Sequence, residues 1–340
     1  MNPLVEQLLS GSRRAVARLL TMVENEREGV DEALAALFPH TGRAWVIGIT
    51  GAPGTGKSSL VNALAKALRR EGRTVGIIAV DPTSPFTGGA ILGDRIRMRD
   101  LSGDTGVFIR SMATRGSLGG LARTTRDAIR VLDAAGFDVV LVETVGAGQS
   151  EVDIVRTAQT TVVVEAPGLG DDVQAIKAGI LEIADVLVVN KADRPGADNT
   201  VRALRAMLEL GHPVSRRRVI AHHGQLIEAA APDSQAEPEA LWVPPIVKTA
   251  ATDETGFDEL LAALERHYQH LRNGEAAAAL ERQRIEIELH DRLRQTLLGR
   301  LLASVSSDEI ARVIERVQAR QLDPQQAVQT ILAIATSQES

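Results

Sequence analysis

The sequence predicts an α/β protein with a mostly parallel sheet, and three observations lead to this fold class. From about residue 41, short apolar runs alternate with segments of helical periodicity. A glycine-rich motif at residues 51–58 stands between the first apolar run and the first of these helices. A second polar motif, at residues 190–193, directly follows another apolar run. Because the carboxyl ends of parallel strands share one edge of the sheet, we expect both motifs at that edge.

The composition excludes several classes of protein. Hydrophobic residues make up 44% of the 340 residues, which is enough for a sizeable core. Aromatic residues make up only 2% and the net charge is −6, so we expect no nucleic-acid partner. The chain has no cysteine, which fits a reducing compartment, and no apolar run approaches the roughly 18 residues of a membrane span. We therefore expect a cytoplasmic protein without a membrane partner.

The pattern changes twice along the chain. Residues 3–38 carry two apolar stripes at helical spacing, and Arg13, Arg14 and Arg18 line the opposite face, which we expect to be solvated. After about residue 275 the alternation stops and only helical periodicity remains. We therefore expect an N-terminal helical segment, an α/β domain and a C-terminal helical arm, at residues 1–40, 41–273 and 274–340.

The apolar runs of the α/β domain define its expected strands, at residues 46–50, 75–80, 107–109, 139–143, 161–165, 186–190 and 245–249. Helices are expected between them, at residues 57–71, 117–135, 172–183, 198–209 and 256–272. Such alternation favours a sheet that is covered on both faces. The prolines and the basic run within residues 211–244 indicate an insertion before the last strand, and the sequence assigns it no role.

The glycine-rich motif matches the phosphate-binding pattern G-x-x-x-x-G-K-[ST] at every fixed position. Its glycines let backbone N–H groups converge on a phosphate, and the helix that follows adds the positive end of its dipole. Lys57 supplies a charge to the outer phosphates, and the Ser58 hydroxyl can ligate Mg²⁺. The expected nucleotide-binding residues are Gly51, Ala52, Pro53, Gly54, Thr55, Gly56, Lys57, Ser58 and Ser59.

The second motif, Asn190-Lys191-Ala192-Asp193, has the pattern N-K-x-D at the end of an expected strand. A carboxylate such as Asp193 accepts from the paired N1–H and N2–H donors of guanine, and adenine offers no such pair. A site built around that carboxylate leaves it unpaired with the wrong base, which gives discrimination. A weaker signal is Thr249-Ala250, whose backbone N–H groups could close over the base edge. We expect GTP and GDP as the bound nucleotides.

Glu143 ends another expected strand, where an acidic residue can hold Mg²⁺ or its water shell. Gly146 leaves room for the backbone to approach the γ-phosphate. Many GTPases carry a water-orienting Gln directly after this glycine, where this chain has Ala147; Gln149 lies further on and is the candidate substitute. We therefore expect slow intrinsic hydrolysis and a partner that accelerates it.

The run 81–98 begins where the second expected strand ends. Its prolines and glycines exclude a regular element, while Asp81 and Asp94 offer metal ligands and Arg95 and Arg97 offer phosphate partners. A loop that orders on the triphosphate and loosens on the diphosphate has this composition, although an ordinary loop has it as well.

Five apolar residues recur at steps of four in the C-terminal arm: Ile285, Leu289, Leu293, Leu297 and Leu301. A helix over residues 275–303 would be about 43 Å long, more than one compact domain usually covers. Ser306 and Glu309 have capping-box spacing for a second helix, and Asp323-Pro324 starts a third. We expect the stripe to be buried in a second subunit, which makes the chain a homodimer; the alternative is a helix folded back on its own domain.

The run 81–98, joined to residues 143–151, closely resembles the methylmalonyl-CoA mutase-associated GTPases, the MeaB/ArgK-type chaperones of the SIMIBI class. The similarity covers nearly the whole chain, and it implies a P-loop GTPase domain in a homodimer that binds an adenosylcobalamin-dependent acyl-CoA mutase. Such a protein controls cofactor delivery to the mutase and protects or reactivates it.

The resemblance also implies roles for single residues. The Mg²⁺ region is served by the residues that match Ser58, Asp81, Asp94 and Glu143. A mobile segment that matches residues 168–179 carries Asp171 and the lysine implicated in mutase-stimulated hydrolysis, here Lys177. The catalytic residues implied by the motifs and the resemblance together are Lys57, Glu143, Gln149 and Lys177.

Two other functions stay open. A nickel-insertion metallochaperone GTPase belongs to the same class, but such proteins present clusters of Cys or His, and here the only adjacent pair is His222-His223. A P-loop kinase would share the phosphate loop, and Asp193 argues against it. The sequence does not identify the mutase, nor does it decide whether the chain contacts cobalamin.

Overall fold

The computed structural model describes residues 2–82, 98–101, 103–114, 120–144, 157–168, 183–210, 242–272 and 275–337. All but the last residue of the expected helix at 172–183, and most of the insertion at 211–244, lie outside these ranges. The chain forms two compact units, Met1–Gly274 and Glu275–Ser340. Among the described residues, no helix is both long enough and apolar enough to cross a membrane.

The first unit is built on a seven-stranded sheet with the order β3-β2-β4-β1-β5-β6-β7. All six pairings between these strands are parallel, which confirms the α/β fold class. The strands are β1 (Trp45–Thr50), β2 (Val75–Pro82), β3 (Val107–Thr114), β4 (Val139–Thr144), β5 (Thr160–Glu165), β6 (Val186–Val189) and β7 (Ile246–Lys248).

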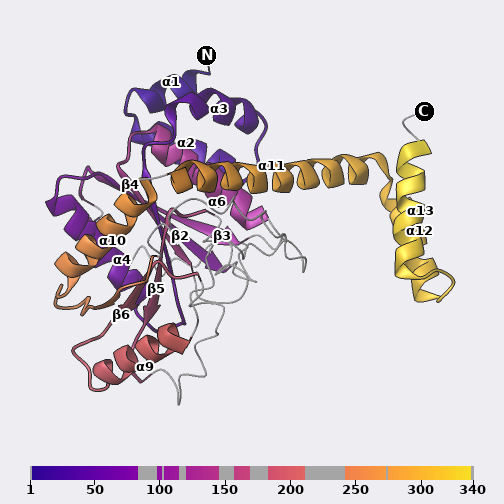
Figure 1. Ribbon diagram of the computed structural model, residues 1–340. Coiled ribbons are helices and arrows are strands. Elements are labelled where there is room, and N and C mark those ends of the chain that lie inside the picture. Colours follow the sequence, from indigo (N-terminus) through magenta and orange to yellow (C-terminus); the bar gives the residue numbers. More distant parts are fainter. Residues whose placement is uncertain are drawn as a thin grey trace. The chain divides into compact units, whose positions relative to one another are not determined.

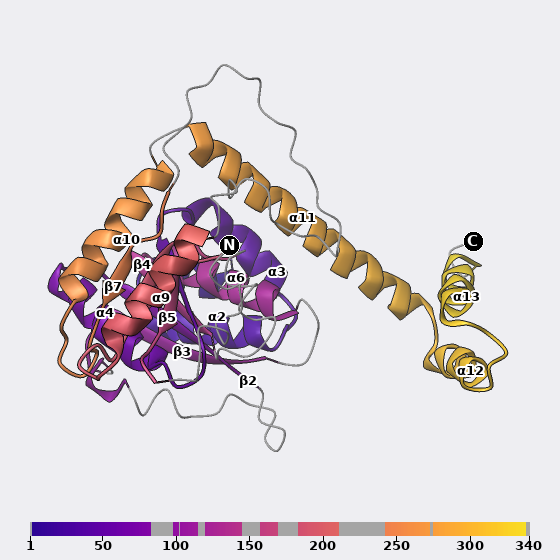
Figure 2. The ribbon, with the colours of Figure 1, turned by 60° about the horizontal axis from the view of Figure 1, so that its bottom comes forward.

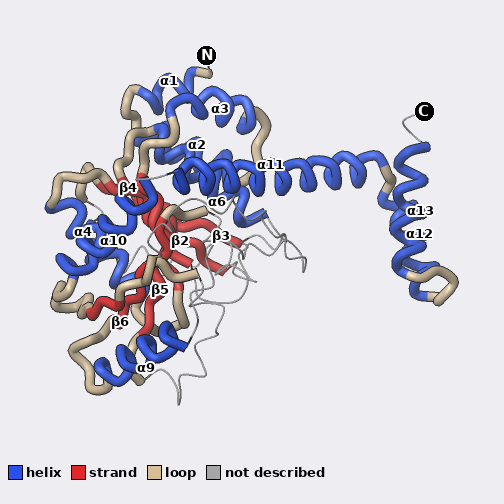
Figure 3. Tube along the Cα trace, in the orientation of Figure 1, coloured by secondary structure: helices blue, strands red, loops and turns tan. Residues whose placement is uncertain are grey.

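Helices cover both faces of the sheet (Figures 1 and 3). One face packs against α4 (Lys57–Arg70) and α10 (Phe257–Arg272), and the other against the N-terminal helices and α6 (Gly120–Ala134). Alternate residues of one strand serve the two faces: Ile47 and Ile49 of β1 belong to the α4–α10 core, and Val46 belongs to the other. Another of the described helices, α9 (Ala197–Leu210), contacts β6 and β7.

The N-terminal helices are α1 (Pro3–Leu9), α2 (Arg13–Glu24) and α3 (Val30–Leu37), followed by the short 3₁₀ helix η1 (Phe38–His40). They share one core with α6 and the sheet. The basic face of the N-terminal helices is not fully solvated, contrary to our expectation. The guanidinium of Arg13 donates to the carbonyls of Thr105 (2.6 Å) and Val107 (2.5 Å). β3 is an edge strand, and an edge leaves carbonyl groups that no neighbouring strand binds.

The second unit contains α11 (Glu275–Ser304), α12 (Ser307–Gln318) and α13 (Pro324–Ser337), with α12 and α13 packed side by side (Figure 2). The expected capping box is confirmed: the Glu309 N–H donates to Ser306 Oγ, and the Ser306 N–H donates to Glu309 Oε2 at 2.9 Å. Asp323 caps α13 by accepting from the N–H groups of Gln325 and Gln326. The boundaries of this unit's helices follow from these polar caps.

Candidate nucleotide-binding site

The glycine-rich loop connects β1 to α4 at the carboxyl edge of the sheet. Gly51, Gly54 and Gly56 have φ values of 140°, 82° and 90°. A Cβ on Gly51 would lie 2.1 Å from the carbonyl oxygen of Val164, and a Cβ on Gly56 would lie 2.6 Å from Asn190 Nδ2. Glycine is therefore needed at these positions both for backbone conformation and for close approach.

Lys57 is the first residue of α4, and its side chain lies inside the loop. Its ammonium group donates to the carbonyls of Gly51 (2.8 Å) and Ala52 (3.0 Å), and the residue is only 7% exposed. Thr55 Oγ1 donates to the same Ala52 carbonyl at 2.9 Å. The loop thus places a buried cation beside the N-terminal end of a 14-residue helix, and this combination favours an anion.

Ser58, the second residue of α4, meets Glu143 of β4. Ser58 Oγ donates to Glu143 Oε1 at 2.6 Å, and both residues are buried. Glu143 is the last residue but one of β4, which pairs with β1 so that Ile49 lies beside it. A hydroxyl and a carboxylate are hard oxygen donors, so this pair fits the ligand preference of Mg²⁺.

The other predicted metal and catalytic residues are only partly within the described structure. Asp81 lies near the end of β2, with Ala113 of β3 as its register partner. Asp94, Gly146, Gln149, Asp171 and Lys177 lie outside the described ranges, as does His222-His223. Among the described residues, no group of three or more His, Cys, Asp or Glu is placed to hold a metal ion.

Asn190 follows β6 and is buried against the phosphate loop. Its Nδ2 donates to the Thr55 carbonyl at 2.9 Å, and its Oδ1 accepts from Thr249 Oγ1 (3.2 Å) and from the Ala251 N–H (3.3 Å). The amide therefore connects the loop after β1 with the loop after β7, a role that the motif alone does not predict.

Lys191 and Asp193 complete the second motif. Lys191 has a φ of 56°, and its ammonium group donates to the Gly54 carbonyl at 2.6 Å. Asp193 is exposed, so its carboxylate is accessible to an entering base. The structure thus brings the phosphate loop and the N-K-x-D segment together, as the sequence predicts.

Thr249 and Ala250 follow β7 close to Asn190, and their N–H groups donate to carbonyl groups of the protein itself. The Thr249 N–H donates to Val189, and the Ala250 N–H donates to Thr255 at 3.1 Å. An antiparallel bridge between Ala250 and Thr255 closes this loop on itself. These N–H groups are therefore bonded within the protein, and their closing over the base edge stays a prediction.

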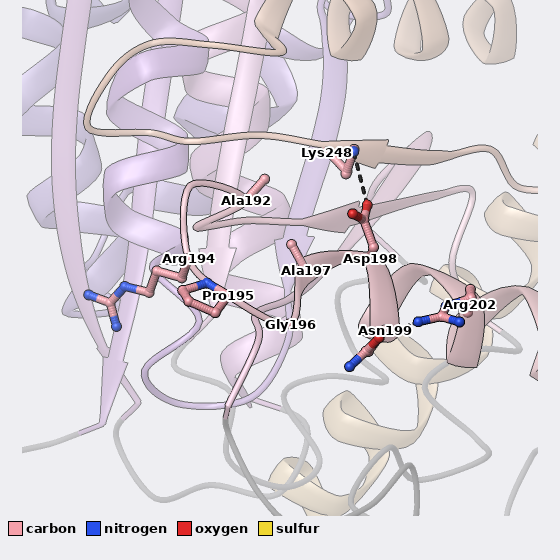
Figure 4. A pocket seen from close by; sticks show the side chains of 9 residues that line it. All are labelled: Ala192, Arg194, Pro195, Gly196, Ala197, Asp198, Asn199, Arg202 and Lys248. Atoms are coloured by element: carbon pink, nitrogen blue, oxygen red, sulfur yellow. Dashed lines mark hydrogen bonds and ion pairs between the residues drawn. The ribbon is translucent and has the colours of Figure 1, made fainter.

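A shallow cavity of about 350 Å³ lies beside the N-K-x-D segment (Figure 4). Lys248 and Asp198 point toward each other across it and form an ion pair at 3.1 Å, whereas Arg194 points away from them. The lining residues come from 192–202 and from Lys248, so the cavity does not include the phosphate loop.

A buried strand, a glycine loop that holds a lysine, and a helix define a P-loop nucleotide-binding protein, and the adjoining N-K-x-D segment is typical of its guanine-specific branch. Comparisons with known proteins agree with this class. The family described as "Methylmalonyl Co-A mutase-associated GTPase MeaB" matches residues 16–306. The chain belongs to this family and is a GTPase that binds guanine nucleotide.

Individual relatives extend over most of the chain. A Pyrococcus abyssi protein, which its name calls a GTPase, is 48% identical over 332 residues, covering 98% of this chain and 96% of the relative. The mouse methylmalonic aciduria type A homolog, mitochondrial, is 31% identical over 345 residues, covering 96% of this chain and 77% of the relative. The crystal structure of a LAO/AO transport system kinase has a TM-score of 0.68 at 26% identity, covering 98% of this chain and 96% of that one.

Proposed function

We propose that this GTPase is a chaperone of an adenosylcobalamin-dependent acyl-CoA mutase, with methylmalonyl-CoA mutase as its partner, and that it controls cofactor delivery and protects or reactivates that enzyme. The family match over residues 16–306 carries the proposal, since the family description names this mutase. The name of the mouse relative, which refers to methylmalonic aciduria, supports the same partner.

In this proposal the guanine base is recognised by Asp193, because its exposed carboxylate can accept from N1–H and N2–H of guanine. Asn190 and Lys191 position the phosphate loop and the loop after β7 around the nucleotide. Thr249 contributes through its hydroxyl contact with Asn190, at 3.2 Å. Base and phosphates are thus recognised by two loops that are hydrogen-bonded to each other.

Hydrolysis is assigned to the phosphate side of the site. The oxygen of a water molecule attacks the γ-phosphorus, the bond to the β–γ bridging oxygen breaks, and GDP and phosphate leave. Lys57 offsets the charge on the phosphates, and Ser58 and Glu143 would hold Mg²⁺, with Asp81 and Asp94 proposed as further ligands. When bound, Mg²⁺ would supply neutralisation of the phosphate charge.

The rate of the isolated protein is proposed to be slow. Ala147 occupies the place in which many GTPases carry a water-orienting glutamine. Gln149 and Lys177 are the proposed substitutes, and the mutase is proposed to accelerate hydrolysis through the segment that carries Lys177.

We also propose that the second unit forms a homodimer. Ile285, Leu289, Leu293 and Leu297 of α11 are 50–61% exposed in the single chain. A row of large apolar side chains on a 30-residue helix is a surface that a second copy can bury.

A pull-down experiment tests the mutase proposal. The immobilised protein is offered methylmalonyl-CoA mutase or isobutyryl-CoA mutase, each with GDP, with a non-hydrolysable GTP analogue, or without nucleotide. We expect methylmalonyl-CoA mutase to bind, with at least about a fivefold difference in affinity between the two nucleotide states. Equal binding in all states would contradict a nucleotide switch, and no binding of either mutase would contradict the partner.

A further inference from the structure

Lys66 lies near the middle of α4, the helix whose first residues are Lys57 and Ser58. Its ammonium group is 2.5 Å from Asp100 Oδ2 and 3.2 Å from Glu254 Oε1. Asp100 and Glu254 are 154 residues apart in the sequence (254 minus 100), and one lysine joins them.

Glu254 belongs to the loop after β7, which contacts the N-K-x-D segment. Hydrogen bonds between Ala250 and Thr255 close this loop, and the Ala251 N–H donates to Asn190 Oδ1. Glu254 itself has a φ of 53°, a conformation that non-glycine residues seldom adopt and that costs about 1 kcal/mol or more. Its carboxylate accepts from Lys66 and from Arg70 Nη1, at 2.8 Å, so α4 holds the strained turn in place.

Asp100 belongs to η2 (Arg99–Leu101), where the described chain resumes at the end of the 81–98 run. Met98 and Leu101 are buried in the same core as α4, so this turn is anchored beside the helix. Asn62 Nδ2 donates weakly to the same Asp100 oxygen, at 3.4 Å. The turn thus has its charged contact with Lys66 at a point directly after the 81–98 run, whose composition suits either a nucleotide-responsive loop or an ordinary one.

The electrostatics of the three groups agree with this geometry. The hydrogen bond to Asp100 raises the pKa of Lys66, and the same bond lowers the pKa of Asp100. Arg70 first, and then Lys66, lowers the pKa of Glu254. All three groups are therefore charged at neutral pH.

We propose that Lys66 is a positioning residue that couples the loop after β7, on the base side of the nucleotide, to the η2 turn, which directly follows the 81–98 run. A bound guanine orders the loop after β7. Through Lys66, this order favours the position that the η2 turn takes with the triphosphate. This inference rests on the proposed nucleotide site.

Arg70 provides a matched control on the same helix. It contacts Glu254 as Lys66 does, and no contact between it and Asp100 is found among the described residues. Arg70→Met therefore removes one cation from the loop after β7 and keeps the bridge to η2, whereas Lys66→Met removes the bridge and keeps the length of the aliphatic stem.

The test measures dissociation constants for GDP and for a non-hydrolysable GTP analogue with the wild type, Lys66→Met, Lys66→Arg and Arg70→Met. We expect Lys66→Met to lower the affinity for the GTP analogue relative to GDP by about three- to tenfold. Lys66→Arg should restore the ratio to within about twofold, and Arg70→Met should leave it within about twofold of the wild type. Melting temperatures are measured in parallel, because a lysine that only stabilises the fold would lower them without changing the ratio.

A double-mutant cycle separates coupling from two local effects. Asp100→Asn and Glu254→Gln each change one carboxylate and leave the other in place, and the two carboxylates are joined by Lys66. Their effects on the ratio of GTP-analogue to GDP affinity should therefore be non-additive only while Lys66 is present. An unchanged ratio in Lys66→Met, or additive effects in the cycle, would overturn the inference while leaving nucleotide binding intact. If Lys66→Met does not fold, the cycle decides alone. A wild type that binds neither nucleotide would overturn the inference and the proposed site together.

Discussion

The side-chain amide of Asn190 holds three parts of the site together. It donates to the phosphate loop at Thr55 and accepts from the Thr249 hydroxyl and the Ala251 N–H. Gly56 packs directly against it, so the two sequence motifs are in contact and not merely on the same edge of the sheet. An amide suits this place because it is a donor and an acceptor at once.

Asp193 is the residue whose proposed role is tested most simply. In Asp193→Asn the acceptor pair for guanine is lost and an amide donor takes its place, which suits xanthine because xanthine presents a carbonyl at C2. We expect affinity for GDP to fall by about 100-fold and affinity for xanthosine diphosphate to rise. Competition against a fluorescent guanine nucleotide measures both, and an unchanged preference for GDP would remove Asp193 from base recognition.

At the scale of elements, the linker between η1 and β1 is fixed by one residue of α6. Asp133 is buried, and its carboxylate accepts from the N–H groups of Gly42 (2.5 Å), Arg43 (3.1 Å) and Ala44 (2.9 Å). These contacts join the N-terminal helices to the strand that leads into the phosphate loop. Three backbone donors lose their acceptor if this carboxylate is removed.

We expect Asp133→Ala to lower the free energy of unfolding by about 2–4 kcal/mol, because it leaves the buried Ala44 N–H without a partner and removes the two part-buried hydrogen bonds from Gly42 and Arg43. Urea unfolding measures the difference. Glu28→Gln, at an exposed position in the loop before α3, should stay within about 0.5 kcal/mol of the wild type. A loss as small as that of the control would show that the three hydrogen bonds are replaced by water at no cost.

An ion pair at the turn before β3 makes the stability of the fold depend on pH. Arg69 of α4 binds Asp104 through two bonds, Nε to Oδ2 at 2.9 Å and Nη2 to Oδ1 at 3.0 Å. The Arg69 guanidinium, and then the Gly106 N–H, hold the pKa of Asp104 below its ordinary value of 3.8. A carboxyl group whose pKa is lowered on folding stabilises the fold fully above the unfolded value, and this stabilisation is lost as pH falls through the folded value.

We therefore expect Asp104→Asn to be less stable than the wild type at pH 7, with a difference that shrinks once the pH falls below 3.8. Chemical unfolding at a series of pH values measures the two curves. Curves that stay parallel down to pH 3 would contradict a stabilising role for the ionised carboxylate.

The elements that the sequence predicts well are those with one dominant signal. The continuous apolar runs of β1, β4 and β5 and the loop at 51–58 were predictable because buried parallel strands and phosphate loops each have a distinct pattern. β3 extends to Thr114, beyond the expected 107–109, because Arg110 and Ser111 interrupt its apolar pattern. Arg110 pairs with Glu24 of α2, a contact between residues 86 positions apart.

The contacts between distant segments of the chain could not be predicted from the sequence. The contacts of Arg13 with β3 and of Lys66 with Asp100 and Glu254 depend on how distant segments pack, and no local pattern encodes them. A lysine or arginine on a helix most often faces water, so the sequence gives no reason to single these out.

At the scale of the whole molecule, the second unit adds a long helix with exposed apolar side chains. We expect Leu293→Glu and Leu297→Glu to convert a dimer into a monomer of 36.3 kDa, because buried carboxylates without partners oppose association. Ala303→Glu adds the same charge at an exposed position off the stripe by helical spacing, and should leave the dimer intact. Light scattering coupled to size-exclusion chromatography measures the mass; a wild type that is already monomeric would contradict the dimer.

The central claim is that one site, formed by the phosphate loop and the N-K-x-D segment, binds guanine nucleotide. Calorimetric titration of the wild type and of Lys57→Ala with GDP and with ADP, in the presence of Mg²⁺, tests it most directly. We expect one GDP per chain, at least about 100-fold weaker binding of ADP, and no measurable binding of either by a folded Lys57→Ala variant. Equal affinity of the wild type for ADP, or GDP binding by Lys57→Ala as tight as that of the wild type, would contradict the claim.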